Sequence, residues 1–518
     1  MDSERSELGP PPMAGLGSPF PHDVKQLMQR IDDATWEQLV PLVVTVRDRA
    51  NSSPSDQRSL PVVERLARRV TRLRNQQGLP STETLTALLD GFTTAFREAS
   101  ASSPTMAAFW LQAATAIAQR QHVPQIIQLI QSNASSEWRS LAIGLSPLCD
   151  MNAKIAPEFF SQFSPQDVSG EQLSVLLDMC NLLTRTQRVK EHPWRAHVEL
   201  LIRLLNGLVS QLERGQEDPS RLGDSVEQVQ KQLDDALALV ISLCDALGLI
   251  GDVRGVAALE GAMDLKHRRI QVEAAAALAR LDHEGGRERL FALAADRIAR
   301  RRAIAYADEL GILDQVDPQF TEPVAIAESN LANWLAEPSQ FGFAPQHMEL
   351  VDSRTLFWPG YHEPQPWFLF RYEYQLASGD SFSNIGIAGP IEMAVQADLG
   401  NLPVDDIYAV FAGWEVEHET IFEIPAERLI STDRRHMDLL IEKLEAEGYT
   451  EVRPLEMAWF FNTMALVGYA QQGDRHLAVV ADEHEILAYP TGEQTTAFKP
   501  STVLSLYRGR RLLRAFND

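Results

Sequence analysis

The stretch Ala246-Leu247-Gly248-Leu249-Ile250-Gly251-Asp252 returns 31 residues later as Ala277-Leu278-Ala279-Arg280-Leu281-Asp282. Each stretch is typical of a chain that closes one helix and opens the next. Leu259, behind the first stretch, is matched by Leu290 at the same spacing, so the period covers a pair of helices. A fixed period of this size is typical of stacked helical hairpins. The sequence therefore predicts a helical array in this part of the chain.

The repeated stretch resembles the HEAT family, in the short form found in phycobilisome-lyase-type proteins, whose units end in Ala-Leu-Gly-x-Ile-Gly-Asp. Residues 246–259 match that ending and its continuation. In the second unit Ala279 stands where the family usually has glycine, and Gly285-Gly286 replace its apolar continuation. The resemblance covers about residues 245–311. It implies antiparallel helix pairs stacked with a right-handed turn, and a family used more often for scaffolding than for catalysis.

Helical periodicity extends well beyond the repeat. Residues 23–315 are predicted as an all-α array of helical hairpins, a HEAT-like α-solenoid, with longer helices at 197–212 and 225–247. Residues 23–230 show no clear 31-residue identity, so a separate helical bundle in that region stays an alternative. Residues 1–22 are rich in proline and glycine without a helical period, and we expect a disordered tail there.

Composition and charge narrow the function classes. A chain of 518 residues exceeds the size of one hydrophobic core, so more than one domain is expected. The formal charge of −24 opposes general attraction to nucleic acid or anionic lipid. Three distant cysteines exclude a disulfide framework or a CxxC metal pattern. The opening residues lack the basic start and apolar core of a secretory signal, and no segment is apolar enough to span a membrane. We expect a soluble, cytoplasmic protein.

Composition changes after residue 318. Eight of nine tyrosines, five of nine tryptophans and most of the net acidity, 13 Lys+Arg against 30 Asp+Glu, fall in residues 321–518. Aromatic residues favour strands, so residues 331–518 are predicted as an α+β domain with a largely antiparallel sheet, joined through a connecting segment at 316–330. The predicted elements are a hairpin at 367–388, helices at 403–418 and 433–447, and strands at 464–470, 477–481 and 486–489.

Two basic clusters lie about one repeat apart. A stacked solenoid would bring both clusters to the same edge, where they could bind an anionic partner or the acidic second domain of the same chain. The alternative is that these charges are solvated or paired locally. The candidate partner-binding residues are Arg268, Arg269, Arg297, Arg300, Arg301 and Arg302.

Candidate ligand-binding residues lie in the second half. Gly386 and Gly389 precede a possible short helix at 391–398, where a glycine turn could present amides to phosphate, although a simple strand-to-helix turn is the favoured interpretation. Glu415 and His418 lie three residues apart on the predicted helix, as two metal ligands could, but such pairs arise by chance in Glu-rich helices. No metal and no cofactor are predicted.

The aromatic segment from Trp358 to Trp367 has two interpretations. Its prolines could stiffen a recognition groove lined by aromatic rings. Alternatively, the segment covers the sheet of its own domain.

Two functions remain open from the sequence. The first is a scaffold or adaptor whose helical surface binds a protein partner, with an acidic domain that binds or regulates. The second is an enzyme or small-ligand-binding protein with its site in the α+β domain or the cleft between domains. The sequence contains no recognised motif for a catalytic serine or cysteine nucleophile, which favours the first function. The expected partner is a protein whose identity the sequence does not indicate.

Overall fold

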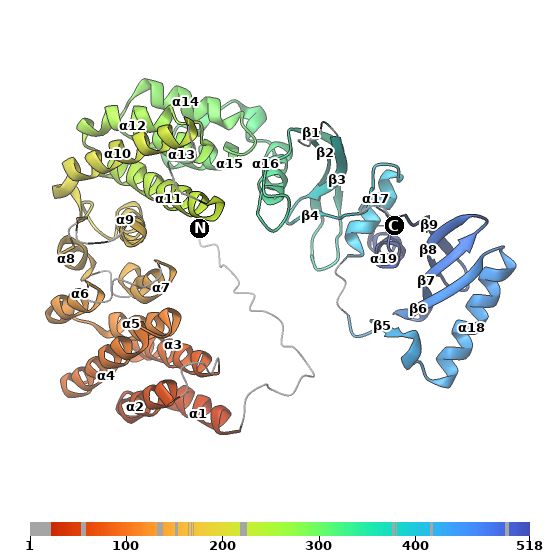
Figure 1. Ribbon diagram of the computed structural model, residues 1–518, viewed down its shortest axis with the longest axis horizontal. Coiled ribbons are helices and arrows are strands. Elements are labelled where there is room, and N and C mark those ends of the chain that lie inside the picture. The colour runs from red at the N-terminus through yellow and green to blue at the C-terminus, as the bar shows by residue number, and fades with distance from the viewer. Residues whose placement is uncertain are drawn as a thin grey trace. The chain divides into compact units, whose positions relative to one another are not determined.

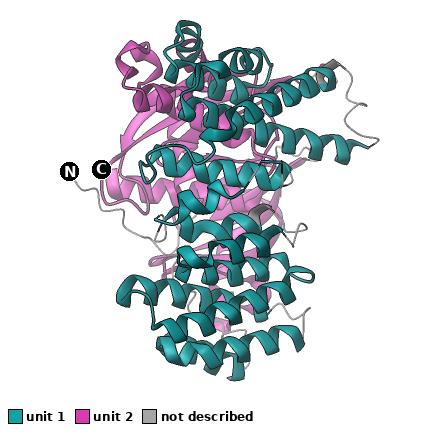
Figure 2. Cartoon of the chain, turned by 90° about the vertical axis from the view of Figure 1, so that its left-hand side faces the viewer, with its two compact units in different colours: residues 1–290 teal, residues 291–518 magenta. Residues whose placement is uncertain are grey.

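The computed structural model describes residues 22–517, apart from the short segments 53–57, 132–137, 151–153, 164, 167, 169, 218–224, 376–378, 380, 415–417 and 493–496. Nearly all of the predicted tail, residues 1–21, lies outside the described residues. The chain divides into two compact units, residues 1–290 and 291–518, coloured separately in Figure 2. Among the described residues, no helix combines the length and the apolar character needed to cross a membrane.

Unit 1 consists of helices packed in two layers. Odd-numbered helices lie against one another from α1 to α13, and even-numbered helices form the second layer. Figure 1 shows the odd-numbered helices on the inner side of the curved stack, and we call them the inner layer. The α-helices of this unit are α1 His22–Asp33, α2 Trp36–Ser52, α3 Ser59–Gln77, α4 Thr82–Ser100, α5 Pro104–Ile117, α6 Val123–Gln131, α7 Trp138–Cys149, α8 Ala156–Ser161, α9 Gly170–Arg185, α10 Val198–Glu217, α11 Val226–Ile250, α12 Val256–Met263 and α13 Arg268–Arg280, followed by α14 Glu284–Ala294, which the unit boundary cuts.

The repeated sequence stretch forms the contact between α11 and α13. A Cβ on Gly248 would lie 2.8 Å from the Cα of Ala277, so the glycine of the first stretch lets the two helices approach where the second stretch begins. A left-handed residue follows each helix, Gly251 at φ +73° directly after α11 and Asp282 at φ +60° two residues after α13. Glycine and, less often, aspartate accept this conformation at helix ends. The repeat therefore encodes helix packing and helix termination.

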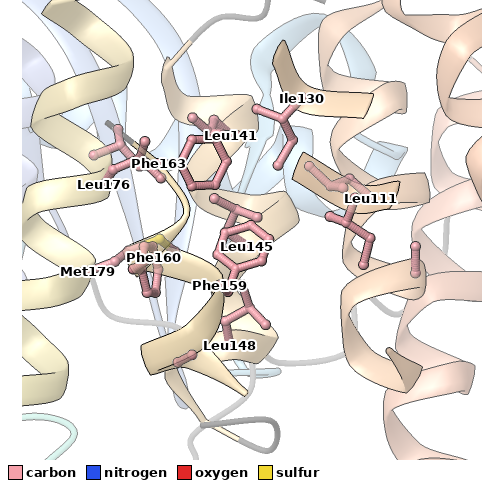
Figure 3. Packing of buried hydrophobic residues seen from close by; sticks show 14 of the residues in the cluster. Leu111, Ile130, Leu141, Leu145, Leu148, Phe159, Phe160, Phe163, Leu176 and Met179 are labelled. Carbon is pink, nitrogen blue, oxygen red and sulfur yellow. The ribbon is translucent and has the colours of Figure 1, made fainter. Parts of the chain in front are cut away.

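One hydrophobic core runs through unit 1, from Val24 in α1 to Leu278 in α13. Figure 3 shows its middle, where side chains of α5 to α9 interdigitate. The Phe159 ring lies 5.3 Å from that of Phe160, and the Trp194 indole N–H donates to the Phe160 carbonyl oxygen at 2.8 Å. The helices that precede the repeat share this core, which confirms an α-helical array; among the described residues they have no core separate from that of the repeat.

Unit 2 contains two antiparallel sheets. Sheet A has the order β1-β2-β3-β4 and sheet B the order β5-β6-β7-β8-β9, as meanders of consecutive strands. The predicted α+β fold is therefore confirmed. The strands are β1 His347–Leu356, β2 Gln365–Gln375, β3 Ser381–Ala388, β4 Glu392–Ala394, β5 Ile421–Pro425, β6 Thr450–Phe460, β7 Thr463–Gln472, β8 Arg475–Ala481 and β9 Ile486–Pro490, and the helices are α15 Arg300–Glu309, α16 Pro323–Leu335, α17 Val404–Ala412, α18 Ser431–Ala446 and α19 Pro500–Asn517.

The two sheets of unit 2 repeat one plan. Helix α16, strands β1–β4 and helix α17 follow one another in the same order as α18, β6–β9 and α19. The first helix of each series packs on one face of its sheet. The second helices, α17 and α19, lie between the sheets in one shared core (Figure 1). Strand β5 is an addition at the edge of sheet B.

Two glycines bring α17 and α19 together. A Cβ on Gly509 would lie 1.7 Å from the Ala409 carbonyl oxygen, and one on Gly413 would lie 1.9 Å from the Ser505 carbonyl oxygen. No other residue fits these backbone contacts. Helix α17 ends at Ala412 and is followed by a turn at Gly413 and Trp414, so the helix predicted at 403–418 is too long at its C-terminal end, where residues 415–417 lie outside the described residues.

Most other predicted elements of unit 2 are confirmed. The hairpin at 367–388 is β2 and β3, and the helix at 433–447 is α18. The predicted helix at 391–398 is wrong, because Glu392–Ala394 form strand β4. The Asn384 side chain holds the residues that follow, as its amide group donates to the carbonyl oxygens of Val395 and Ala397 at 2.9 and 3.0 Å.

Candidate functional site

The first basic cluster begins α13 in unit 1. Arg268 and Arg269 are exposed, and the Arg268 guanidinium donates to the Gln271 side-chain oxygen at 3.0 Å. The second basic cluster belongs to unit 2. That the two clusters form one edge, and that this edge binds the acidic domain, therefore stay predictions.

The second cluster is partly used inside unit 2. Arg300 is only 5% exposed, and its guanidinium binds the Ala325 carbonyl oxygen at 2.7 Å and the Glu328 carboxylate at 2.6 Å. Arg297 lies 3.8 Å from the same carboxylate. These two arginines join the chain around α15 to α16. Arg301 and Arg302 are exposed.

The predicted glycine turn is a packing feature. A Cβ on Gly386 would lie 3.0 Å from the Leu331 side chain of α16, and one on Gly389 would lie 2.7 Å from the Pro366 carbonyl oxygen. Strand β4 follows this turn, so no helix N-terminus is present to bind phosphate as predicted.

The predicted helical pair of Glu415 and His418 can be followed only at His418, which is not part of a helix. Glu415 lies outside the described residues, and His418 follows the end of α17. The His418 ring is exposed, and its Nδ1 lies 2.7 Å from the Thr420 hydroxyl. The described parts of the chain contain no group of three or more His, Cys, Asp or Glu side chains that could hold a metal ion.

Trp358 and Trp367 belong to the core. Their rings stack with centroids 4.1 Å apart, and both side chains are buried. The aromatic segment thus covers its own sheet, and it does not form a groove along these two rings.

A buried carboxylate joins the β8–β9 turn to α19. Asp482 is fully buried, and it accepts hydrogen bonds from the Tyr507 hydroxyl at 2.7 Å and from the Arg511 guanidinium. Burial raises its pKa, but these hydrogen bonds and those from the turn amides outweigh burial and hold the pKa of Asp482 below its ordinary value. The group is structural, because its partners already occupy both carboxylate oxygens.

A row of charged side chains crosses the inner layer of unit 1 at α9, α11 and α13. Asp245 pairs with Arg185 of α9 and lies 3.8 Å from Arg280 of α13. The Ser242 hydroxyl of α11 donates to the Asp178 carboxylate of α9 at 2.7 Å. Displacement of water by the surrounding protein raises the pKa of Asp178, and the Ser242 hydrogen bond and the positive charge of Arg269 oppose that rise. We call Asp178, Arg185, Asp245, Arg269 and Arg280 the inner charged row. The row places both positive and negative side chains on three neighbouring helices of the inner layer, α9, α11 and α13.

An aromatic pocket opens on the α16 face of sheet A. Its volume is about 460 Å3, and the loop after α16 forms one wall. The Phe341 ring stacks on Tyr374 with centroids 4.7 Å apart, and the Phe343 ring meets Tyr374 edge-on at 5.0 Å. The aromatic pocket is lined by the rings of Phe341, Phe343, Tyr372, Tyr374 and Phe382, with Ser339, Gln340, Ala394, Val395 and Gln396 around them.

The chemistry of this pocket suits binding better than reaction. The Tyr374 hydroxyl donates to the Phe343 carbonyl oxygen at 3.1 Å. Burial raises the pKa of Tyr374 to about 12 and that of Tyr372 further, so both phenols stay neutral near pH 7. No acidic or basic side chain is found among the described residues of the lining. The pocket therefore fits an uncharged, apolar group.

The sequence analysis missed this pocket. Phe341 and Phe343 flank Gly342 in a segment without periodicity, and Tyr372 and Tyr374 stand about 30 residues further along a strand. Alternation in β2 places both tyrosines on one face, which is the only signal that the sequence offers.

Comparison of the chain with protein-family models, with curated proteins and with solved structures gives no match.

Proposed function

We propose that this protein is an adaptor that binds another protein through the inner layer of unit 1. The observation that carries the proposal is the inner charged row, which lies partly exposed on three successive helices of the array. Charges arranged in this way give specificity and faster association, because a complementary partner is attracted and others are repelled. The resemblance of residues 245–311 to HEAT units, a family used mostly for scaffolding, supports the same function.

The proposal places the protein in the cytoplasm. Cys149, Cys180 and Cys244 are free thiols, as is usual in a reducing compartment. The net charge of −24 favours a protein partner over nucleic acid.

The second candidate function is binding of a ligand by unit 2. The aromatic pocket favours it over catalysis, because its tyrosines stay protonated and are hydrogen-bonded inside the protein.

A charge reversal tests the adaptor function. Arg269→Glu changes the sign of an exposed member of the inner charged row, and Arg203→Glu is the matched control, since Arg203 is exposed on α10 in the other layer. We expect full-length Arg269→Glu to retain less of its partner than wild type in pull-downs from the source cells, with the largest difference at low salt. Arg203→Glu should retain as much as wild type.

Equal retention by both variants across the salt series would reject the inner layer as the interface. Arg300 is unsuitable for this test because its side chain is buried and paired with Glu328.

A further inference from the structure

The two sheets of unit 2 differ at their last strand, β4 in sheet A and β9 in sheet B. In sheet B, β9 pairs with β8 from Ile486 to Pro490, and the Thr491 amide continues the contact by donating to the His476 carbonyl oxygen at 2.8 Å. In sheet A, β4 pairs only with Gly386 to Ala388 of β3. Among the described residues, no strand pairs with residues 381–384 on the side away from β2.

The side chain of Asn384 accounts for this difference. It binds the carbonyl oxygens of Val395 and Ala397, and its own oxygen accepts from the Leu399 amide at 3.1 Å. The chain after β4 is thus held by one side chain, where sheet B has a strand. Asn384 lies four residues before Ala388, the end of β3 that pairs with β4. In sheet B the residue four positions before Ala481, the matching end of β8, is Leu477, and its side chain cannot form such hydrogen bonds. The short β4 is therefore encoded at Asn384.

The aromatic pocket lies beside this unpaired part of β3. Phe382 of β3 and Gln396 after β4 both line the pocket. Across it, Phe341 and Phe343 remain 39% and 48% exposed, although both rings are large and apolar. Unpaired strand edges and exposed apolar rings are each costly to leave open, because they invite association.

We propose that the edge of β3 at residues 381–383 and the aromatic pocket together bind an extended peptide segment of a partner protein. The segment adds to β3 as a strand and places one large, uncharged apolar side chain among the pocket rings. Main-chain hydrogen bonds to a sheet edge give affinity, and pockets for alternate side chains give specificity. Sheet B supports a strand as the occupant, because β9 fills the corresponding place there.

The charge of the bound side chain follows from the lining. The described lining residues carry no charge that could pair with a buried ion, and an unpaired charge is costly to bury. Phenylalanine, leucine or a similar side chain therefore fits, and aspartate does not. This site belongs to unit 2 and does not depend on the inner charged row.

The test uses the full-length chain and labelled peptides. The probe is a capped host peptide of threonine and serine with one central residue, which is phenylalanine, leucine, alanine or aspartate. Binding is followed by fluorescence anisotropy. We expect the phenylalanine and leucine peptides to bind about tenfold or more tightly than the alanine and aspartate peptides, from the burial of one large apolar side chain. N-methylation of alternate backbone amides should weaken binding, because it removes strand pairing.

A double variant locates the site. Phe341→Ala with Phe343→Ala should abolish the preference for phenylalanine over alanine. Phe422→Ala is the matched control, because Phe422 is 40% exposed and stacks on Trp459 in sheet B, with centroids 5.1 Å apart. It should leave the preference unchanged.

Three results would overturn the proposal. The first is no binding of any peptide at millimolar concentration. The second is a preference that survives the double variant. The third is equal binding of the N-methylated peptide or of N-acetyl-phenylalanine amide, which would assign the pocket to a small uncharged ligand and not to a strand.

Discussion

His192 makes the stability of unit 1 depend on pH. Its side chain is 3% exposed, and the Trp194 amide donates to its Nδ1 at 3.2 Å. The other nitrogen, Nε2, lies 3.0 Å from the Asn181 side-chain oxygen and must therefore carry the proton. Both nitrogens are satisfied only in the neutral ring. Burial lowers the pKa of His192 to about 4.

The size of the effect follows from the two protonation states. A histidine in the unfolded chain has a pKa near 6.5. Below that pH the unfolded state binds a proton that the folded state does not, so stability falls as the pH decreases from about 6.5 to about 4. Between pH 7 and pH 5 we expect His192 alone to lower the free energy of unfolding of unit 1 by about 2 kcal/mol.

Two buried cysteines report on the same region. Cys180 of α9 and Cys244 of α11 are fully buried, so a thiol reagent active at acid pH labels them only when the array opens. The measured quantity is the urea concentration at which half of Cys180 and Cys244 becomes labelled. Between pH 7 and pH 5 this concentration should fall more in wild type than in His192→Gln, because glutamine does not bind a proton in this pH range. An equal shift in both proteins would refute the assignment of the pH dependence to His192.

Three substitutions with matched comparisons test unit 2 by calorimetry and urea unfolding. Gly509→Ala forces a Cβ into the backbone of α17, and we expect the free energy of unfolding to fall by about 3 kcal/mol or more. Gly473→Ala, in an open turn at φ +58°, should lower it by about 1 kcal/mol. Equal losses would refute the close crossing of α17 and α19. Asp482→Asn should cost about 3 kcal/mol at pH 7, because it removes a buried charge from its partners. The lowered pKa of Asp482 stabilises the fold at neutral pH, and this stability is lost as acid protonates the carboxylate, so the variant should lose less stability than wild type on acidification. An identical acid response of both proteins would contradict this. Arg300→Ala removes a buried guanidinium that binds the Ala325 carbonyl oxygen and the Glu328 carboxylate, and it should cost about 2 kcal/mol, against about 0.5 kcal/mol or less for the exposed Arg301→Ala; similar costs would contradict a structural role of Arg300.

The fold could be predicted where local signals and packing agree. The hairpin at 367–388 has alternating apolar residues on both sides of a Gly-Asp turn, and the repeat around Gly248 marks helix ends that the structure confirms. Helix 433–447 likewise has one apolar face, which packs on sheet B.

Other features depend on residues distant in sequence. The apolar period of α17 continues to Trp414, but the helix ends at Ala412, and Gly413 contacts α19 about 100 residues further on, which no local pattern reveals. Strand β4 was predicted as a helix because a short apolar run fits both periods, and the side chain of Asn384 decides its path. The aromatic pocket combines a loop after α16 with strand β2, so spacing along the chain could not reveal it.

Photo-crosslinking tests the adaptor function most directly. A benzoyl-phenylalanine placed at position 269, on the inner layer, or at position 203, on the other layer, reports which layer contacts a partner in the source cells. Both positions are exposed. Binding through the inner layer predicts a discrete crosslinked partner from position 269 that weakens with added salt, and little from position 203. Equal products from both positions, or none from position 269, would contradict it.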